Sequence, residues 1–120
     1  MSQNYFLART GGFLKRINYD DIHYLETADN YTKVYTSNGY VSVRITFKQA
    51  LEDLKERRFV QVHRCYAVSV DNIDLITGEN ITLLSDPENP MPYNPKYLNA
   101  LLKHVKVLGP QFDLNDEAED

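Results

Sequence analysis

The sequence is short of several residue types and patterns, and their absence narrows the kinds of protein it can encode. It has 120 residues with no tryptophan and a single cysteine, Cys65, which cannot form a disulfide within the chain. No apolar run approaches the roughly 18 residues of a membrane span, and the N-terminus lacks the basic and apolar regions of a signal peptide. We therefore expect a soluble cytoplasmic domain without contact to a membrane.

Sequence signatures of catalysis are missing as well. There is no GxGxxG, P-loop, HExxH or GxSxG motif. The three histidines, His23, His63 and His104, lie in separate segments without metal-ligand spacing. Cys65 and His63 could form a nucleophilic pair, because positions i and i+2 of a strand share a face. A buried cysteine beside a surface histidine is the competing interpretation, and we expect no enzyme, no metal and no cofactor.

The charges are unevenly distributed along the chain. The net charge is −4, and residues 111–120 carry five acidic side chains and no lysine or arginine. Without those five, 12 acidic and 13 basic side chains remain. A nearly neutral body neither requires nor forbids a partner that carries phosphates. We expect residues 1–109 to form one domain and residues 110–120 to form a disordered acidic tail.

The first half of the chain has the pattern of consecutive antiparallel strands. Nine tyrosines and five phenylalanines favour sheet, where aromatic side chains pack on a pleated surface. Turn signals at Gly11-Gly12, Ala28–Asn30 and Asn38-Gly39 separate the apolar segments. The expected strands are Tyr5–Arg9, Phe13–Ile17, Ile22–Thr27, Tyr31–Thr36 and Tyr40–Arg44.

A short helix is predicted next. Thr46 and Gln49 stand at capping-box spacing, and the apolar residues that follow recur at helical intervals up to an end near Arg57-Arg58. Strand character then returns over Phe59–Leu84, with a hairpin near Gly78-Glu79.

The C-terminal part is predicted to contain a loop and a second helix. Ser85–Pro90 contains two prolines and is expected to be irregular. Asn94-Pro95 predicts the start of the helix, with Asn94 as its N-cap, and Gly109-Pro110 predicts its end. The residues thus indicate a mostly β domain covered by two helices.

Basic side chains occur where a strand or a helix would present them to a partner. Arg64 interrupts an apolar segment, and its fork geometry suits guanine edges or phosphates. A structural salt bridge to Asp71 or Asp74 is the alternative. Lys96, in the first turn of the second helix, could bind a phosphate together with the free amides there, or could simply be solvated.

Two blocks of sequence resemble the LytTR-type DNA-binding domain of bacterial transcription regulators. Ile22–Tyr31 is similar to the family's I-x-Y-I-E-A-x-x-x-Y. Phe59–Ile73, which contains His63-Arg64, is similar to F-x-R-V-H-R-S-Y-I-V-N-L-x-x-I. The helix after Thr46 lies between them, as the family's S-L-K-x-L-E helix does, and Tyr97–Leu102 matches the closing helix. The resemblance covers roughly residues 5–106.

The resemblance implies a mainly β fold of short antiparallel strands in packed small sheets with two short helices. Members of the family insert loops into successive major grooves and bind direct repeats as two copies. By position, Thr32 and Lys33 would approach a groove or the backbone, Arg64 would read a base edge or a phosphate, and Lys96 would hold the second contact. The full set of implied DNA contacts is Asn30, Thr32, Lys33, His63, Arg64, Asn94 and Lys96.

Several positions depart from the family pattern in ways that remove cations. Asn94-Pro95 replaces a frequent Ser-Arg, Gln61 stands where many members have Arg, and Asp86 and Glu88 add negative charge to the Ser85–Pro90 loop. Each lost phosphate contact would flatten the salt dependence by a slope of about 0.9.

The main hypothesis is a stand-alone, sequence-specific regulator that binds double-stranded DNA, as a homodimer on direct repeats. Its input would come from abundance, a partner protein or a ligand. The alternative is a protein-interaction module with weak or lost DNA binding, whose partner would be a sensor or regulator protein. A further alternative is an acidic tail that folds over the basic face as an autoinhibitor.

Overall fold

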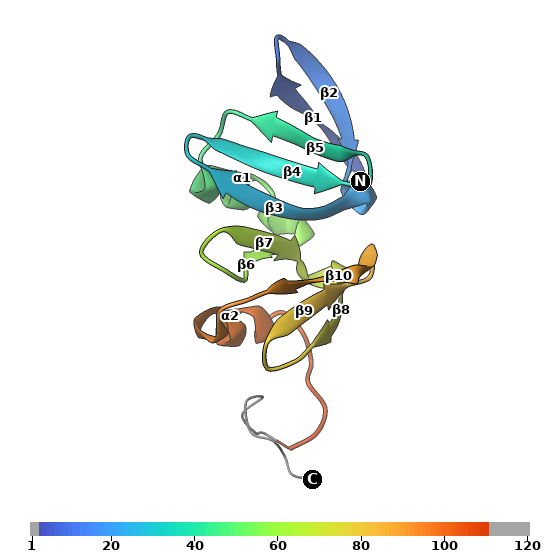
Figure 1. Cartoon of the computed structure of the whole chain (residues 1–120), viewed down its shortest axis with the longest axis vertical. Coiled ribbons are helices and arrows are strands. Elements are labelled where there is room, and N and C mark those ends of the chain that lie inside the picture. The colour runs from blue at the N-terminus through green and yellow to red at the C-terminus, as the bar shows by residue number, and fades with distance from the viewer. Residues whose placement is uncertain (1–2, 111–120) are drawn as a thin grey trace.

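The computed structural model describes residues 3–110, so the expected acidic tail, apart from Pro110, lies outside the described residues. Within this range, ten strands form three antiparallel sheets of two, five and three strands (Figure 1). Two short α-helices accompany them. The fold class predicted from the sequence is confirmed: a mainly β protein of short antiparallel strands in small sheets.

The five-stranded sheet has the order β5-β4-β3-β7-β6 and lies between the other two (Figure 1). Tight turns join β3 to β4 and β4 to β5, and Asp29 in the first of them has a φ of +57°. Its strands are β3 (Ile22–Ala28), β4 (Tyr31–Thr36), β5 (Gly39–Val43), β6 (Phe59–Gln61) and β7 (Tyr66–Ser69).

Two smaller sheets cover the ends of the molecule. The first is the hairpin of β1 (Tyr5–Thr10) and β2 (Phe13–Asn18), whose turn residues Gly11 and Gly12 both have positive φ. Glycine suits that turn because other residues rarely adopt this backbone conformation. The second sheet has the order β10-β9-β8, with β8 (Ile73–Ile76), β9 (Asn80–Leu83) and β10 (Asp86–Pro92).

The strand pattern predicted for Phe59–Leu84 is divided among four strands. A turn over residues 62–65 separates β6 from β7, and a 3-10 turn over Val70–Asn72 separates β7 from β8. The expected hairpin near Gly78-Glu79 is present, since Thr77 N donates to Asn80 O at 2.9 Å. The chain therefore turns at His63-Arg64 instead of running straight through it.

The prediction of an irregular loop over Ser85–Pro90 is wrong, because β10 begins at Asp86. Asp86 pairs with Leu83, and Met91 and Pro92 pair with Ile81 and Asn80, with a register shift between them. Pro87 and Pro90 fall in the shifted stretch of an edge strand, where a missing N–H breaks no ladder hydrogen bond. The buried Met91 anchors the strand against the core.

The first helix begins as predicted and ends earlier. The Thr46 side chain caps α1 (Phe47–Asp53) by accepting a hydrogen bond from Gln49 N at 3.1 Å. A 3-10 turn over Lys55–Arg57 then carries the chain to Arg58, whose φ of +61° ends the helical segment.

The second helix is shorter than predicted. A 3-10 turn over Pro95–Tyr97 leads into α2 (Leu98–Leu102), and Asn94 caps the turn. The helix does not continue to Gly109, because Val105, Val107 and Leu108 find no core to pack against and remain exposed.

The five-stranded sheet separates two hydrophobic cores. Leu25 and Ala67 are fully buried in the first core, beneath α1 and the β1–β2 hairpin. Val68, the neighbour of Ala67 in β7, points the other way into the second core with Ile81, because successive side chains of a strand alternate between faces. None of the helices in the described part of the chain has the length and apolarity to cross a membrane.

Candidate nucleic-acid interface

The turn between β6 and β7 pushes its arginine outward. Val62 is 1% exposed in the second core, whereas Arg64, two residues later, lies on the surface. Backbone bonds close the turn, with Val62 N donating to Tyr66 O at 3.0 Å and Tyr66 N donating to His63 O at 3.2 Å. The side chain of Arg64 is therefore presented by a short, well-anchored loop.

Two backbone hydrogen bonds connect this turn to the other segments predicted to contact DNA. Thr27 N donates to Cys65 O at 3.0 Å, next to the β3–β4 turn, and Asn94 N donates to Val62 O at 2.8 Å. The β3–β4 turn, the β6–β7 turn and the start of the second helical segment lie along one side of the molecule, the left in Figure 1. The structure thus brings together segments that are more than 60 residues apart in the sequence.

His63 is held in one orientation by its neighbours. Its Nδ1 accepts a hydrogen bond from Cys65 N at 3.1 Å, and its ring centroid lies 5.1 Å from that of Tyr66. With Nδ1 as acceptor, the neutral ring carries its proton on Nε2, which is then a hydrogen-bond donor. Cys65 reaches His63 through its backbone, so this contact gives no support to a nucleophilic pair.

Arg64 is available for a partner. Among residues 3–110 its side chain makes no ion pair and no hydrogen bond. The alternative, a structural salt bridge from Arg64 to Asp71 or Asp74, is absent from the described residues, and the Asp71 carboxylate pairs instead with the Arg58 guanidinium at 3.4 Å.

Gln61 supports both sides of the turn. Its Nε2 donates to His63 O at 3.1 Å and lies 3.4 Å from both Arg64 O and the Tyr97 hydroxyl. In the sequence, Gln61 stands out only as a position where many members of the resembling family have an arginine. In the structure it joins the turn that carries Arg64 to the turn that carries Lys96.

Asn94 and Lys96 occupy the start of the second helical segment. Asn94 Oδ1 accepts from Lys96 N at 3.0 Å, which confirms the predicted cap. The Lys96 ammonium is exposed and lies 5.2 Å from the centroid of the Tyr97 ring. The cap leaves the amide nitrogen of the Asn94 side chain free for a further contact.

The β3–β4 hairpin separates the predicted residues by face. Asn30 is exposed in the turn, and Lys33 lies on the face of the sheet opposite the first core, with its ammonium 4.7 Å from the Tyr40 ring centroid. Thr32 is 1% exposed, and its hydroxyl donates to Ile45 O at 3.0 Å. The Thr32 side chain is therefore part of the core beneath the turn and does not reach the surface.

Arg44 and Lys48 are two further cations near these segments. Both are exposed, and they come from the connection that follows β5 and from α1. The Thr32–Ile45 hydrogen bond ties this connection to β4, and Lys48 lines a surface hollow together with Gln61. Sequence reasoning missed them because only the folded chain places this helix beside β6.

The acidic Asp86 lines a surface hollow together with Tyr24 and Tyr66. Ser85 Oγ is 2.6 Å from His23 Nδ1, at the beginning of β3. The β3–β4 turn begins five residues further along, about 17 Å at the rise of a strand. The acidic segment is thus distant from the β3–β4 turn but close to Tyr66, whose ring centroid lies 5.1 Å from that of His63, so its effect on the contact surface stays a prediction.

A row of tyrosines crosses the face of the five-stranded sheet that lies opposite the first core, where Tyr24 and Tyr66 pack against the second core. The Tyr24 and Tyr35 rings stack at 4.6 Å, and Tyr40 and Tyr66 extend the row to either side. Loss of solvent, with the hydrogen bond and negative charge of Glu26, raises the pKa of Tyr35 to about 12. Burial likewise raises the pKa of Tyr66, which stays neutral beside His63.

Residues 3–110 contain no cluster of three or more acidic, histidine or cysteine side chains that could hold a metal ion.

Comparisons with known proteins bear on the family and on the fold. The family model of the LytTr DNA-binding domain matches residues 13–106. Among solved structures, the fold is similar to the LytTr DNA-binding domain of a protein described as a methyl-accepting/DNA response regulator from Bacillus cereus. That comparison has a TM-score of 0.66 and 19% identity, covering 85% of this chain and 96% of the other. No curated protein matches the sequence significantly.

Proposed function

Because the chain belongs to the LytTr DNA-binding domain family, we propose that it binds double-stranded DNA sequence-specifically and regulates transcription without a catalytic step. The observation that carries the proposal is the position of Arg64, an unpaired arginine on an anchored turn between two further contact segments. Such a protein acts where chromosomal DNA lies, so the proposal includes a cytoplasmic location.

The three segments divide the work of recognition. Arg64 enters a major groove and reads a base edge, with His63 Nε2 as a neighbouring donor. Asn94 and Lys96 hold the phosphate backbone on one side of that groove, and Asn30 and Lys33 lie on the other. Arg44 and Lys48 add phosphate contacts, which position the protein without reading sequence.

The domain is proposed to bind direct repeats as two copies, each contributing one such surface. Two copies double the number of base contacts, which is how a domain of this size gains specificity over the many competing sites of a genome. A sensor or regulator protein that supplies the input signal belongs to the same proposal.

Selection from a pool of random duplex DNA tests the function. The selected sequence is then used for fluorescence-anisotropy binding at two salt concentrations. Arg64→Ala should cost about 1–3 kcal/mol on the selected site and relax specificity at one position. Lys96→Ala should weaken binding to all sequences alike and reduce the salt slope by about 0.9. Lys15→Ala, on the exposed β2 strand at the far end of the molecule, is the matched control.

Two outcomes would count against the proposal. If both variants bind as tightly as the unaltered protein, the assignment of the contact residues is wrong. If no motif is enriched and binding is weak at low salt, the same fold serves instead as a protein-interaction module.

A further inference from the structure

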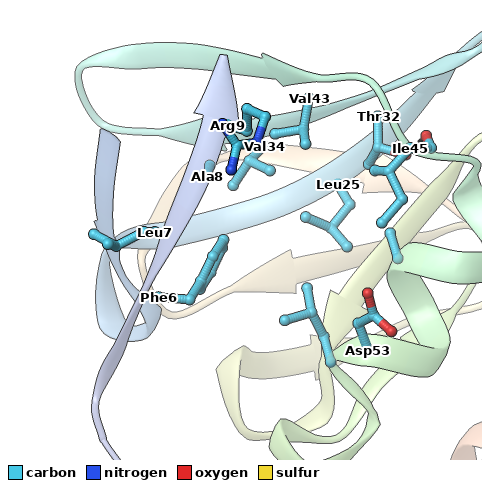
Figure 2. Close-up of a pocket in the computed structure, with 12 residues that line it drawn as sticks. Phe6, Leu7, Ala8, Arg9, Leu25, Thr32, Val34, Val43, Ile45 and Asp53 are labelled. Carbon is cyan, nitrogen blue, oxygen red and sulfur yellow. Dashed lines mark hydrogen bonds between the residues drawn. The ribbon is translucent and has the colours of Figure 1, made fainter. Parts of the chain in front are cut away.

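A cavity of about 160 Å³ lies beside the first core, between β1, the five-stranded sheet and α1, and opens to the surface (Figure 2). Most of its wall is aliphatic or aromatic, and several of the residues that form it belong to the buried core. The main apolar lining residues are Phe6, Ala8, Leu25, Val34, Ala50 and Leu54.

The wall of this cavity contains no buried charge. Arg9 and Asp53, the two ionisable lining residues, are exposed and so mark the mouth. Thr32 also lines the space, but its hydroxyl already donates to Ile45 O at 3.0 Å. A charged occupant would lose its hydration and meet one cation and one anion at the rim, so the lining selects an uncharged molecule.

The size of the cavity limits the occupant to a small ring. Protein interiors are close-packed, and voids larger than a water molecule are few in a domain. In another protein, an engineered cavity of about 150 Å³ lined by Leu, Ile and Phe stays dry and binds benzene. The present cavity has a similar volume and a similar lining. Small side chains, Ala8 and Ala50, leave space on two of its walls.

We propose that this cavity is a binding site for a small uncharged aromatic molecule, of the size of benzene or toluene. The site does not depend on DNA binding. Its β1 wall precedes Phe13, where the family match begins, so the family match does not account for it. The opposite wall includes Thr32 and Ile45, which lie beside the β3–β4 turn and Arg44.

Titration of the whole chain with toluene, followed by NMR of the leucine and valine methyl groups, tests the site. Binding should shift the methyl signals of Leu25, Val34 and Leu54 along saturable curves that share one dissociation constant. Ala50→Leu should fill the cavity and raise that constant at least tenfold. Ala100→Leu, the same substitution on the exposed face of α2, should leave it unchanged.

The proposal fails if the shifts rise linearly with toluene, or if they are as large at the exposed Leu14 and Leu84, which do not line the cavity, as at the cavity itself. It also fails if the Ala50→Leu variant binds toluene like the unaltered protein. Should that variant not fold, Ala8→Val narrows the cavity from the β1 side and must weaken binding in the same way.

Discussion

Replacement of Gln61 by alanine should loosen the turn that presents Arg64 without removing any of the groups proposed to contact DNA. The Gln61 amide donates to His63 O at 3.1 Å and reaches Arg64 O and the Tyr97 hydroxyl at 3.4 Å. The alanine variant loses all three contacts. The variant therefore tests the positioning of Arg64 separately from the DNA contact proposed for its side chain.

The expected magnitudes follow from these distances. Only the 3.1 Å hydrogen bond lies within the usual distance range for N–H···O, so we assign it the full stabilisation of a hydrogen bond and treat the two contacts at 3.4 Å as weak. A net loss of about 1–1.5 kcal/mol in the free energy of unfolding follows. For a domain of this size, that lowers Tm by about 5–8 °C. Part of the Arg64 contribution to DNA affinity is lost too, about 1 kcal/mol or roughly fivefold in Kd.

The assay combines urea unfolding with anisotropy on the selected DNA site. The two substitutions Gln61→Ala and Arg64→Ala should couple, so that Gln61→Ala has almost no further effect on Kd once Arg64 is gone. Gln49→Ala is the control, because the Gln49 side chain bonds only to Asp53 on the exposed surface of α1. Full additivity of the two substitutions, or normal DNA binding by a destabilised Gln61→Ala variant, would refute the positioning role.

Three other predictions follow from contacts described above. Thr46→Ala removes the N-cap of α1 and should lower the free energy of unfolding by about 1 kcal/mol in urea titrations. Thr32→Val should also lower the free energy of unfolding by about 1 kcal/mol, because the Thr32 hydroxyl bonds within the core. DNA affinity should be unchanged, and a clear loss of affinity would show that Thr32 belongs to the interface. In absorbance titrations Tyr35 should ionise near pH 12, a late step absent from Tyr35→Phe. The unfolded chain releases this proton near pH 10, whereas the folded protein keeps it until about pH 12. The free energy of unfolding should therefore fall as the pH rises from about 10 to about 12.

Most of the strands were predictable because local signals decide them. The turns at Gly11-Gly12 and Asn38-Gly39 mark hairpins whatever the rest of the chain does, and Thr46 marks a helix start for the same reason. The family resemblance likewise rested on contiguous residues, and the match over residues 13–106 confirms it.

The sequence-based predictions that were wrong concern segments whose structure depends on contacts with residues far away in the chain. β10 forms despite its prolines because β9 supplies a partner on one side and nothing pairs on the other. The sequence places Thr32 and Lys33 on opposite faces of a strand, but which face is buried depends on the packing of α1 and β1. The role of Gln61 depends on Tyr97, 36 residues away, and no local pattern indicates it.

The two hydrogen bonds that join the contact segments, from Thr27 N and Asn94 N, use main-chain atoms only. Every residue except proline carries these atoms, so the spacing between the segments does not depend on which side chains they bear. In the proposed mode of binding, substitutions at positions 30, 64 and 96 therefore change the DNA contacts while the backbone frame that sets their separation persists. A new operator sequence then becomes accessible through single surface substitutions, both to natural variation and to a designer who wishes to redirect the protein.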